Sequence, residues 1–293
     1  MCLLCPPPAL DFQTPSAAGL PEGPRWSSRR AFVLAGAALA ATPALPAFAQ
    51  VDVGPPSRTR TLVPAESLEK AGDQQYAQLL QQAKAQRALA GADHPQLQKL
   101  RTIARRLIPF TQKWNERATG WKWEVNLIGS KQINAFCMPG GKIAFYTGIL
   151  DQLKLDDDEI AMIMGHEMAH ALREHARERL AKTTGTGMAL QVTAQLLGLG
   201  DLGDLGARMG TQLLSLKFSR DDETEADLVG LELAARAGFR PQSSVSLWQK
   251  MAAASNSQGG IGFLSTHPSG PDRIRVLESN LPKVDGLYRA ARG

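Results

Sequence analysis

Cysteine is scarce in this sequence, which argues against a zinc ribbon and against an internal disulfide. The only three cysteines among the 293 residues are Cys2, Cys5 and Cys137. The first two have no second pair with which to complete a zinc ribbon. If the first 49 residues are removed, as argued below, Cys137 is left alone and no internal disulfide can form. Cys137 itself lies in a predicted strand, so we do not expect it to bind a metal.

A strong excess of charge is also lacking. The 33 Lys and Arg residues outnumber the 28 Asp and Glu residues by 5, and no block of basic residues stands out. This modest excess gives no support to nucleic-acid binding. The length and the 43% hydrophobic content suit one compact domain with an extension, or two small domains.

Charges are lacking in the apolar run near the N-terminus, and this run has the form of an export signal more than that of a membrane-spanning helix. Arg29-Arg30 precedes an uncharged run, and residues 47–49 have the small-x-small form of a signal-peptidase site. The run is Ala-rich, about 19 residues long and interrupted by two prolines. We predict a signal peptide of the twin-arginine type, cleavage after Ala49 and a periplasmic mature protein. Export by the Sec route and an uncleaved membrane anchor stay open as alternatives.

The rest of the chain is predicted to form a single domain. We expect an N-terminal extension with the signal at 1–49, a linker at 50–65, one domain at 66–282 and a tail at 283–293. The apolar stretch 183–218 is rich in Gly and Thr, and its uncharged part is short for a membrane span. We expect it to pack on the core or to line a groove, with association to a membrane surface as the alternative. A Gly- and Ser-rich loop at 257–263 suggests a mobile lid.

Residue patterns predict a mainly α fold (α+β) with a small sheet. Ala, Gln and Leu favour a helix at 66–89, and apolar residues at 3/4 spacing predict an amphipathic helix at 97–114. The basic face of the second helix suits either solvent or an anionic partner. Alternating residues predict strands at 121–127, 134–138 and 142–146, with a turn at 139–141 and a short helix at 147–153. The edge of such a sheet is able to pair with an extended peptide, although an ordinary hairpin has the same pattern.

The chemistry is concentrated in His166-Glu167-Met168-Ala169-His170, an H-E-x-x-H sequence with helical periodicity. Residues i and i+4 project from one face of a helix, so the two histidines are able to bind one metal ion. Glu167 lies beside them, where it can act as general base toward a water on that metal. Acidic residues at 156–159 provide an N-cap and a first turn, and we expect the helix to run to about Lys182, with residues 173–179 exposed.

A catalytic zinc takes three protein ligands, so a third is required. His175 is five residues after His170, which places it roughly 140° from the ligand face of a continuous helix. The metzincin pattern would need Gly and His where this chain has Arg173 and Ala176. We therefore predict that His175 is a surface residue.

The segment Ser219-Arg220-Asp221-Asp222-Glu223-Thr224-Glu225-Ala226-Asp227 supplies a better candidate. Together with H-E-x-x-H it resembles the zinc metallopeptidase (gluzincin) family of HtpX, BepA, LoiP and the CAAX prenyl protease, over roughly residues 95–280. The resemblance is nearest to the soluble periplasmic branch, without that branch's helical repeats. It implies that Glu223 is the third ligand and that Asp227 orients a ligand histidine. Gly230 and Ala234 continue the same helix face, where small side chains would permit close approach of the two helices. Glu225 is expected to point elsewhere.

The same resemblance implies a function. It is that of a zinc metalloendopeptidase, with one Zn²⁺ per chain, that cuts misfolded or unassembled envelope polypeptides. Residues similar to the family's substrate strand and turn are Asn134, Ala135, Phe136, Gly140 and Gly141. His267 and Arg273 are candidates for the donor that stabilises the oxyanion together with zinc. Two other roles are open for His267: a latch that blocks the zinc, or a structural His-Pro turn. Rival functions are a latent zinc-bound chaperone or scaffold and a signal-anchored membrane protease. Contact with a membrane surface or with outer-membrane assembly is a further expectation.

Overall fold

The computed structural model describes residues 50–184, 213, 216–258, 262–268 and 272–293. The predicted signal sequence, most of the apolar stretch 183–218 and the centre of the loop 257–263 lie outside these residues. None of the described helices combines the length and the apolar character that a membrane crossing requires.

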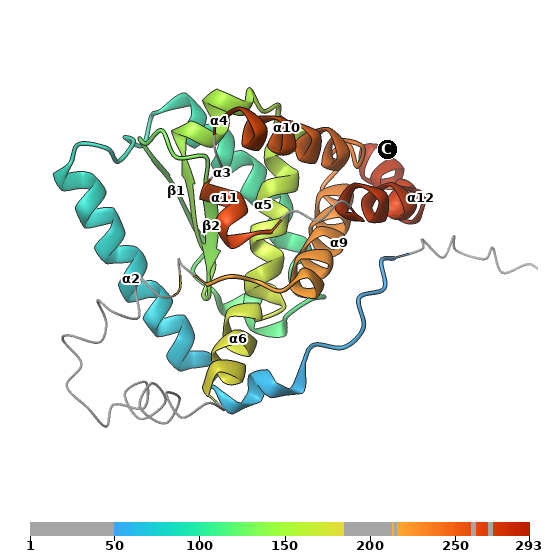
Figure 1. The fold of residues 1–293 in the computed structure, drawn as a ribbon, viewed down its shortest axis with the longest axis horizontal. Coiled ribbons are helices and arrows are strands. Elements are labelled where there is room, and N and C mark those ends of the chain that lie inside the picture. Colours follow the sequence, from blue (N-terminus) through green and yellow to red (C-terminus); the bar gives the residue numbers. More distant parts are fainter. Residues whose placement is uncertain (1–49, 185–212, 214–215, 259–261, 269–271) are drawn as a thin grey trace, which may run out of the picture. The chain divides into compact units, whose positions relative to one another are not determined.

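A three-stranded sheet forms where the alternating patterns predicted it (Figure 1). Its strands are β1 (Glu124–Ile128), β2 (Ala135–Met138) and β3 (Lys142–Tyr146), in the order β1-β3-β2. β3 pairs parallel with β1 and antiparallel with β2. The β2–β3 turn places Gly140 at φ 87° and Gly141 at φ 81°, in the left-handed region that glycine tolerates best. β2 is therefore an edge strand among the described strands.

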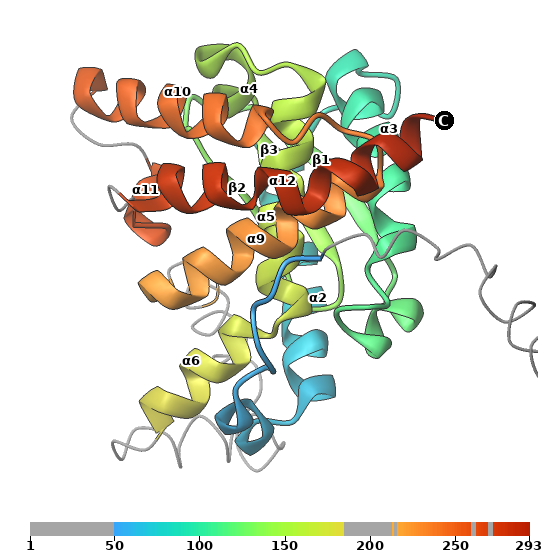
Figure 2. The same cartoon turned by 90° about the vertical axis from the view of Figure 1, so that its right-hand side faces the viewer.

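Helices make up most of the described chain, which confirms the mainly α prediction. They are α2 (Ala65–Ala85), α3 (Pro95–Leu107), α4 (Thr147–Leu153), α5 (Asp157–Leu172), α6 (His175–Thr184), α9 (Arg220–Arg236), α10 (Ser243–Gln258), α11 (Gly262–Thr266) and α12 (Asp272–Arg292). Short 3-10 helices span Arg58–Leu62, Ile108–Phe110 and Glu116–Gly120. In Figure 2, α9, α10 and α12 lie together on one side of α5, in agreement with their contacts.

Helix α5 is the centre of this arrangement. Asp156 caps it: the Asp156 side chain accepts from the Glu159 amide, and the Glu159 side chain accepts from the Asp156 amide. Every residue from Glu159 to Leu172 is buried, because α5 packs against β2, α3, α9 and α10. A helix surrounded on all sides holds its side chains in fixed positions, as a metal site requires.

The close approach of α5 and α9 follows from two glycines that face each other. A Cβ atom added to Gly230 would lie 2.6 Å from the His166 backbone nitrogen, and one added to Gly165 would lie 2.9 Å from the Gly230 carbonyl oxygen. Real Cβ atoms essentially never come this close to backbone. The predicted approach of the two helices at Gly230 is confirmed.

The prediction that the active helix runs to Lys182 is wrong. α5 ends at Leu172, Glu174 adopts φ 59°, and α6 begins at His175 as a separate helix. The expected exposure of 173–179 is wrong as well, since Arg173, His175 and Glu178 are buried. Similarly, the helix predicted at 97–114 stops at Leu107, because Pro109 lacks the amide that would continue the helical hydrogen bonds.

The segments predicted as a linker (50–65) and a tail (283–293) both contain buried residues. Val51 is 4% exposed, and its amide donates to Glu232 Oε2 over 3.0 Å. Glu232 lies on α9 and is fully buried. At the other end, α12 includes residues 283–292 and buries Val284 and Leu287.

Candidate metal centre

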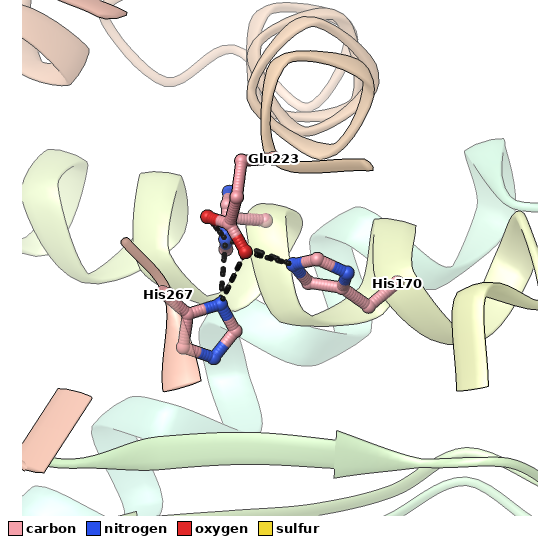
Figure 3. Close-up of side chains that lie close together, drawn as sticks. His170, Glu223 and His267 are labelled. Atoms are coloured by element: carbon pink, nitrogen blue, oxygen red, sulfur yellow. Dashed lines mark hydrogen bonds and ion pairs between the residues drawn. The ribbon is translucent and has the colours of Figure 1, made fainter. Parts of the chain in front are cut away.

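Four buried side chains from three parts of the chain converge on one point. His166 and His170 come from α5, Glu223 from the first turn of α9, and His267 from the residue that follows α11. Each is at most 4% exposed. Figure 3 shows the Glu223 carboxylate facing both His170 and His267. This cluster is able to hold a metal ion.

The distances within the cluster fit a tetrahedral zinc site. Four N and O ligands at about 2.1 Å from a tetrahedral ion lie roughly 3.4 Å from one another. His170 Nε2 is 3.1 Å from His166 Nε2, which is 3.4 Å from His267 Nδ1. The two Glu223 oxygens lie 3.5 Å from His166 Nε2 and His170 Nε2, and Glu223 Oε1 is 3.0 Å from His267 Nδ1. The fourth corner of the cluster therefore belongs to His267 Nδ1.

The protonation states of His170 and Glu223 also suit a metal, whereas His267 differs: burial lowers its pKa, but the charges of Glu167 and Glu223 raise it overall. Burial, followed by the neighbouring histidines, lowers the pKa of His170 well below its ordinary value, which leaves the imidazole neutral. Burial alone would raise the pKa of Glu223, but hydrogen bonding and charge from His267, with the charges of His166 and Arg273, lower it. A neutral imidazole and an ionised carboxylate are the forms that bind zinc.

Asp227 and Arg273 contact two members of the cluster, His166 and Glu223. Asp227 Oδ1 is 3.0 Å from His166 Nδ1, and Arg273 donates to both Asp227 oxygens at 2.7 Å and to Glu223 Oε2 at 2.7 Å. Burial would raise the pKa of Asp227, yet the Arg273 charge and the hydrogen bonds from His166 and Arg273 lower it to about 2. The Arg273 guanidinium also stacks 3.6 Å above the Trp248 ring.

Glu167 is a buried carboxyl group beside the cluster that takes no part in these interactions. It is 2% exposed, its Oε1 has no hydrogen-bond partner, and Oε1 lies 3.5 Å from His267 Nε2. Burial raises its pKa above the ordinary value. A buried oxygen without a hydrogen-bond partner lowers the stability of the fold. Such a group suggests a function, and the role of general base fits its position.

An open hollow adjoins the cluster. β2 forms one wall, the starts of α2 and α6 form others, and Glu167, His170 and His267 lie at its inner end. Much of its lining is apolar, while Glu69, Glu174 and Arg177 add charge. The hollow is therefore suited to a chain with apolar side chains that must reach the cluster.

The predicted substrate residues divide into two groups. Asn134, Ala135 and Phe136 line the hollow. Gly140 and Gly141 do not: they lie in the β2–β3 turn against Asp73 and Trp123. Cys137 also lines the hollow and is outside the metal cluster.

Sequence reasoning missed two neighbours of His170. His175, predicted at the surface, is 1% exposed, and its Nδ1 is 2.9 Å from His170 Nδ1. Phe218 stacks on the His170 ring with centroids 3.9 Å apart. His175 is only five residues from His170, which could have suggested a contact between them. A continuous helix would separate the two side chains, so the contact is expected only once the helix break at Glu174 is known.

Comparison with known proteins agrees with this geometry. The family model described as peptidase family M48 matches residues 95–281. Mitochondrial metalloendopeptidase OMA1 of Saccharomyces cerevisiae is 31% identical over 254 residues, which cover 82% of this chain and 72% of that protein. Mitochondrial metalloendopeptidase OMA1 of Schizosaccharomyces pombe is 39% identical over 165 residues, covering 56% of this chain and 48% of the relative, so the match spans about half its length. Metalloprotease LoiP of Escherichia coli is 27% identical over 188 residues, covering 63% of this chain and 72% of the relative.

Proposed function

Because the chain belongs to peptidase family M48, we propose that it is an exported zinc endopeptidase that cuts misfolded or unassembled polypeptides of the cell envelope. The observation that carries this function is the buried cluster of three histidines and a glutamate at the inner end of an open hollow. His166, His170 and Glu223 are the three zinc ligands of the working enzyme. Zinc in such a site lowers the pKa of a ligated water toward neutrality and polarises a carbonyl group.

Glu167 does the proton transfer. Its unpartnered Oε1 faces the cluster, and its raised pKa brings it nearer to that of an effective base at neutral pH. It takes a proton from the attacking water and returns it to the leaving amine, so that no proton has to cross from solvent to the buried site.

Strand β2 presents the substrate. Asn134 accepts from the Tyr146 amide, so the alternation of an antiparallel pair turns the backbone groups of Ala135 and Cys137 away from β3. An extended polypeptide pairs with such an edge through main-chain hydrogen bonds, which require no particular sequence. That mode of binding suits a protease of unfolded chains.

His267 is a latch in the resting protein. Its Nδ1 occupies the fourth corner of the cluster, where a catalytic site needs water, and its ring stacks on Phe263 with centroids 4.3 Å apart. For cleavage His267 must leave this corner so that water can take its place. Arg273 is committed to Glu223 and Asp227, so we assign it to orienting those carboxylates and not to the oxyanion.

The cellular setting also belongs to the proposal. Export and signal removal after Ala49 are supported by the Arg29-Arg30 segment. The two OMA1 relatives are named as mitochondrial, so family membership alone does not assign the compartment. N-terminal sequencing of the exported protein tests this part: a start at Gln50 supports it, and a retained Arg29-Arg30 segment supports the membrane anchor.

Cleavage of casein by the zinc-loaded protein tests the chemistry. We expect Glu167→Gln to abolish cleavage with zinc still bound, His267→Ala to increase it, and Glu116→Gln, an exposed acid outside the site, to leave it unchanged. The corner held by His267 favours one rival, a latent chaperone or scaffold. If zinc is bound and neither the wild type nor His267→Ala cuts any unfolded protein, the rival is correct.

A further inference from the structure

His170 uses only one of its ring nitrogens in the cluster. Nε2 faces Glu223 and His166, and Figure 3 shows the second nitrogen of the ring on the side away from Glu223. That second nitrogen, Nδ1, lies 2.9 Å from Nδ1 of His175, and both side chains are buried. His166 has the Asp227 carboxylate in the equivalent place. The two histidines of the H-E-x-x-H sequence therefore have chemically different partners.

The contact fixes the protons of both rings, given the zinc site proposed above. If His170 binds zinc through Nε2, its proton is on Nδ1, which must donate. His175 Nδ1 must then accept, so the His175 proton is on Nε2. His175 Nε2 is buried, has no hydrogen-bond partner and lies 3.7 Å from Glu225 Oε2. A carboxylate beside this N–H has the sign of charge that favours it.

Glu225 is itself held in place. Arg173, 5% exposed, donates through Nε to Glu225 Oε1 and through Nη2 to the Gly54 carbonyl oxygen at 2.8 Å. Arg173 comes from the end of α5 and Glu225 from α9, so the pair connects the two helices that provide the zinc ligands. Glu225 has a fixed position without being a ligand.

We propose that His175 and Glu225 are positioning residues for zinc binding: His175 accepts the His170 Nδ1 proton, and Glu225 holds His175 in the tautomer that can accept it. A neutral partner that accepts from a ligand histidine fixes the orientation and tautomer of that ligand. This inference rests on the proposed zinc enzyme. Its consequence is that zinc affinity depends on two residues that do not touch zinc.

Zinc binding by the purified mature protein, measured by competition with a chromophoric chelator, tests the proposal. His175→Phe keeps the ring volume and removes the acceptor, so we expect zinc affinity to fall about 10- to 100-fold. His175→Asn places an oxygen near the position of Nδ1, and we expect it to recover most of that loss. Glu225→Gln should weaken zinc binding about 10-fold. Asp221→Asn, an exposed acid one turn earlier on α9, is the matched control and should bind zinc like the wild type.

The thermal midpoint of each metal-free variant distinguishes positioning from simple packing. The proposal holds if zinc affinity falls in the order wild type, His175→Asn, His175→Phe while the metal-free midpoints stay close together. It is overturned if His175→Phe keeps wild-type affinity, or if affinity and metal-free midpoint fall in parallel in every variant. If the wild type itself fails to bind one zinc per chain, the proposed function is what fails.

Discussion

The contact between α5 and α9 makes Gly230→Ala a sharp test of how the site is built. The new Cβ atom would lie 2.6 Å from the His166 amide nitrogen and 2.8 Å from the Gly165 carbonyl carbon. Ordinary contact begins near 3.4 Å, so the helices must separate by about 0.8 Å, the difference between the two distances. Overpacking of this kind costs about 1–3 kcal/mol, from which the better helix propensity of alanine recovers up to about 1 kcal/mol.

The substitution should weaken zinc binding as well as folding. His166 and His170 belong to α5 and Glu223 to α9, so separating the helices draws the carboxylate away from both histidines. Metal sites tolerate changes of only about 0.2 Å in ligand distance. We therefore expect Gly230→Ala to lose at least 10-fold in zinc affinity while its free energy of unfolding falls by about 1–2 kcal/mol.

Chelator competition and urea unfolding of the metal-free protein measure these two quantities. Gly120→Ala is the control, because a Cβ atom there meets nothing within 4 Å. Gly230→Ala with wild-type zinc affinity would refute the reasoning, since it would show that the distance between α5 and α9 does not determine the position of Glu223.

Three further predictions concern the parts that support the cluster. The pKa of Asp227 is about 2 in the folded protein against an ordinary 3.8; stabilisation by this group is thus complete above pH 4 and lost as pH falls toward 2. In the metal-free protein it amounts to about 2 kcal/mol, roughly half of it lost by pH 3, and urea unfolding should show that this pH dependence is absent from Asp227→Asn. Arg273→Lys keeps the charge but cannot make the paired hydrogen bonds to Asp227, so zinc affinity measured by chelator competition should fall, while Arg275→Lys on the exposed face of α12 should have no effect. Deletion of residues 50–56 removes buried Val51 and the amide that reaches Glu232, and should lower the free energy of unfolding by about 2 kcal/mol relative to a chain that starts at Gln50.

The elements that could be predicted from sequence are those with a local cause. β3 and α4 begin and end where the residue pattern predicted, and Asp156 caps α5 as expected from its position before an apolar helix. The close approach at Gly230 was predictable for the same reason, because a small side chain on a helix face has few other uses. Each of these predictions depends on residues within one or two turns of each other.

The break between α5 and α6 has no such local cause. Neither Gly nor Pro occurs at 173–176, and Glu174 takes up the left-handed conformation that glycine would normally supply. Its carboxylate is held by Arg60 at 3.0 Å and by Arg177 at 3.0 Å. Arg60 is more than 100 residues away in the chain, so no window of sequence around Glu174 contains the reason for the turn.

This distant contact is also what brings His175 to His170. In a continuous helix His175 would point roughly 140° away from the ligand face, whereas the turn at Glu174 directs it back to the buried side. The segment predicted as a linker supports the turn at three places: Gly54 accepts from Arg173, Arg60 pairs with Glu174, and Val63 accepts from Arg177. Residues 54–63 thus hold the turn that gives His170 its second partner. For that reason, a chain that begins after this segment should bind zinc more weakly even where its helices still fold.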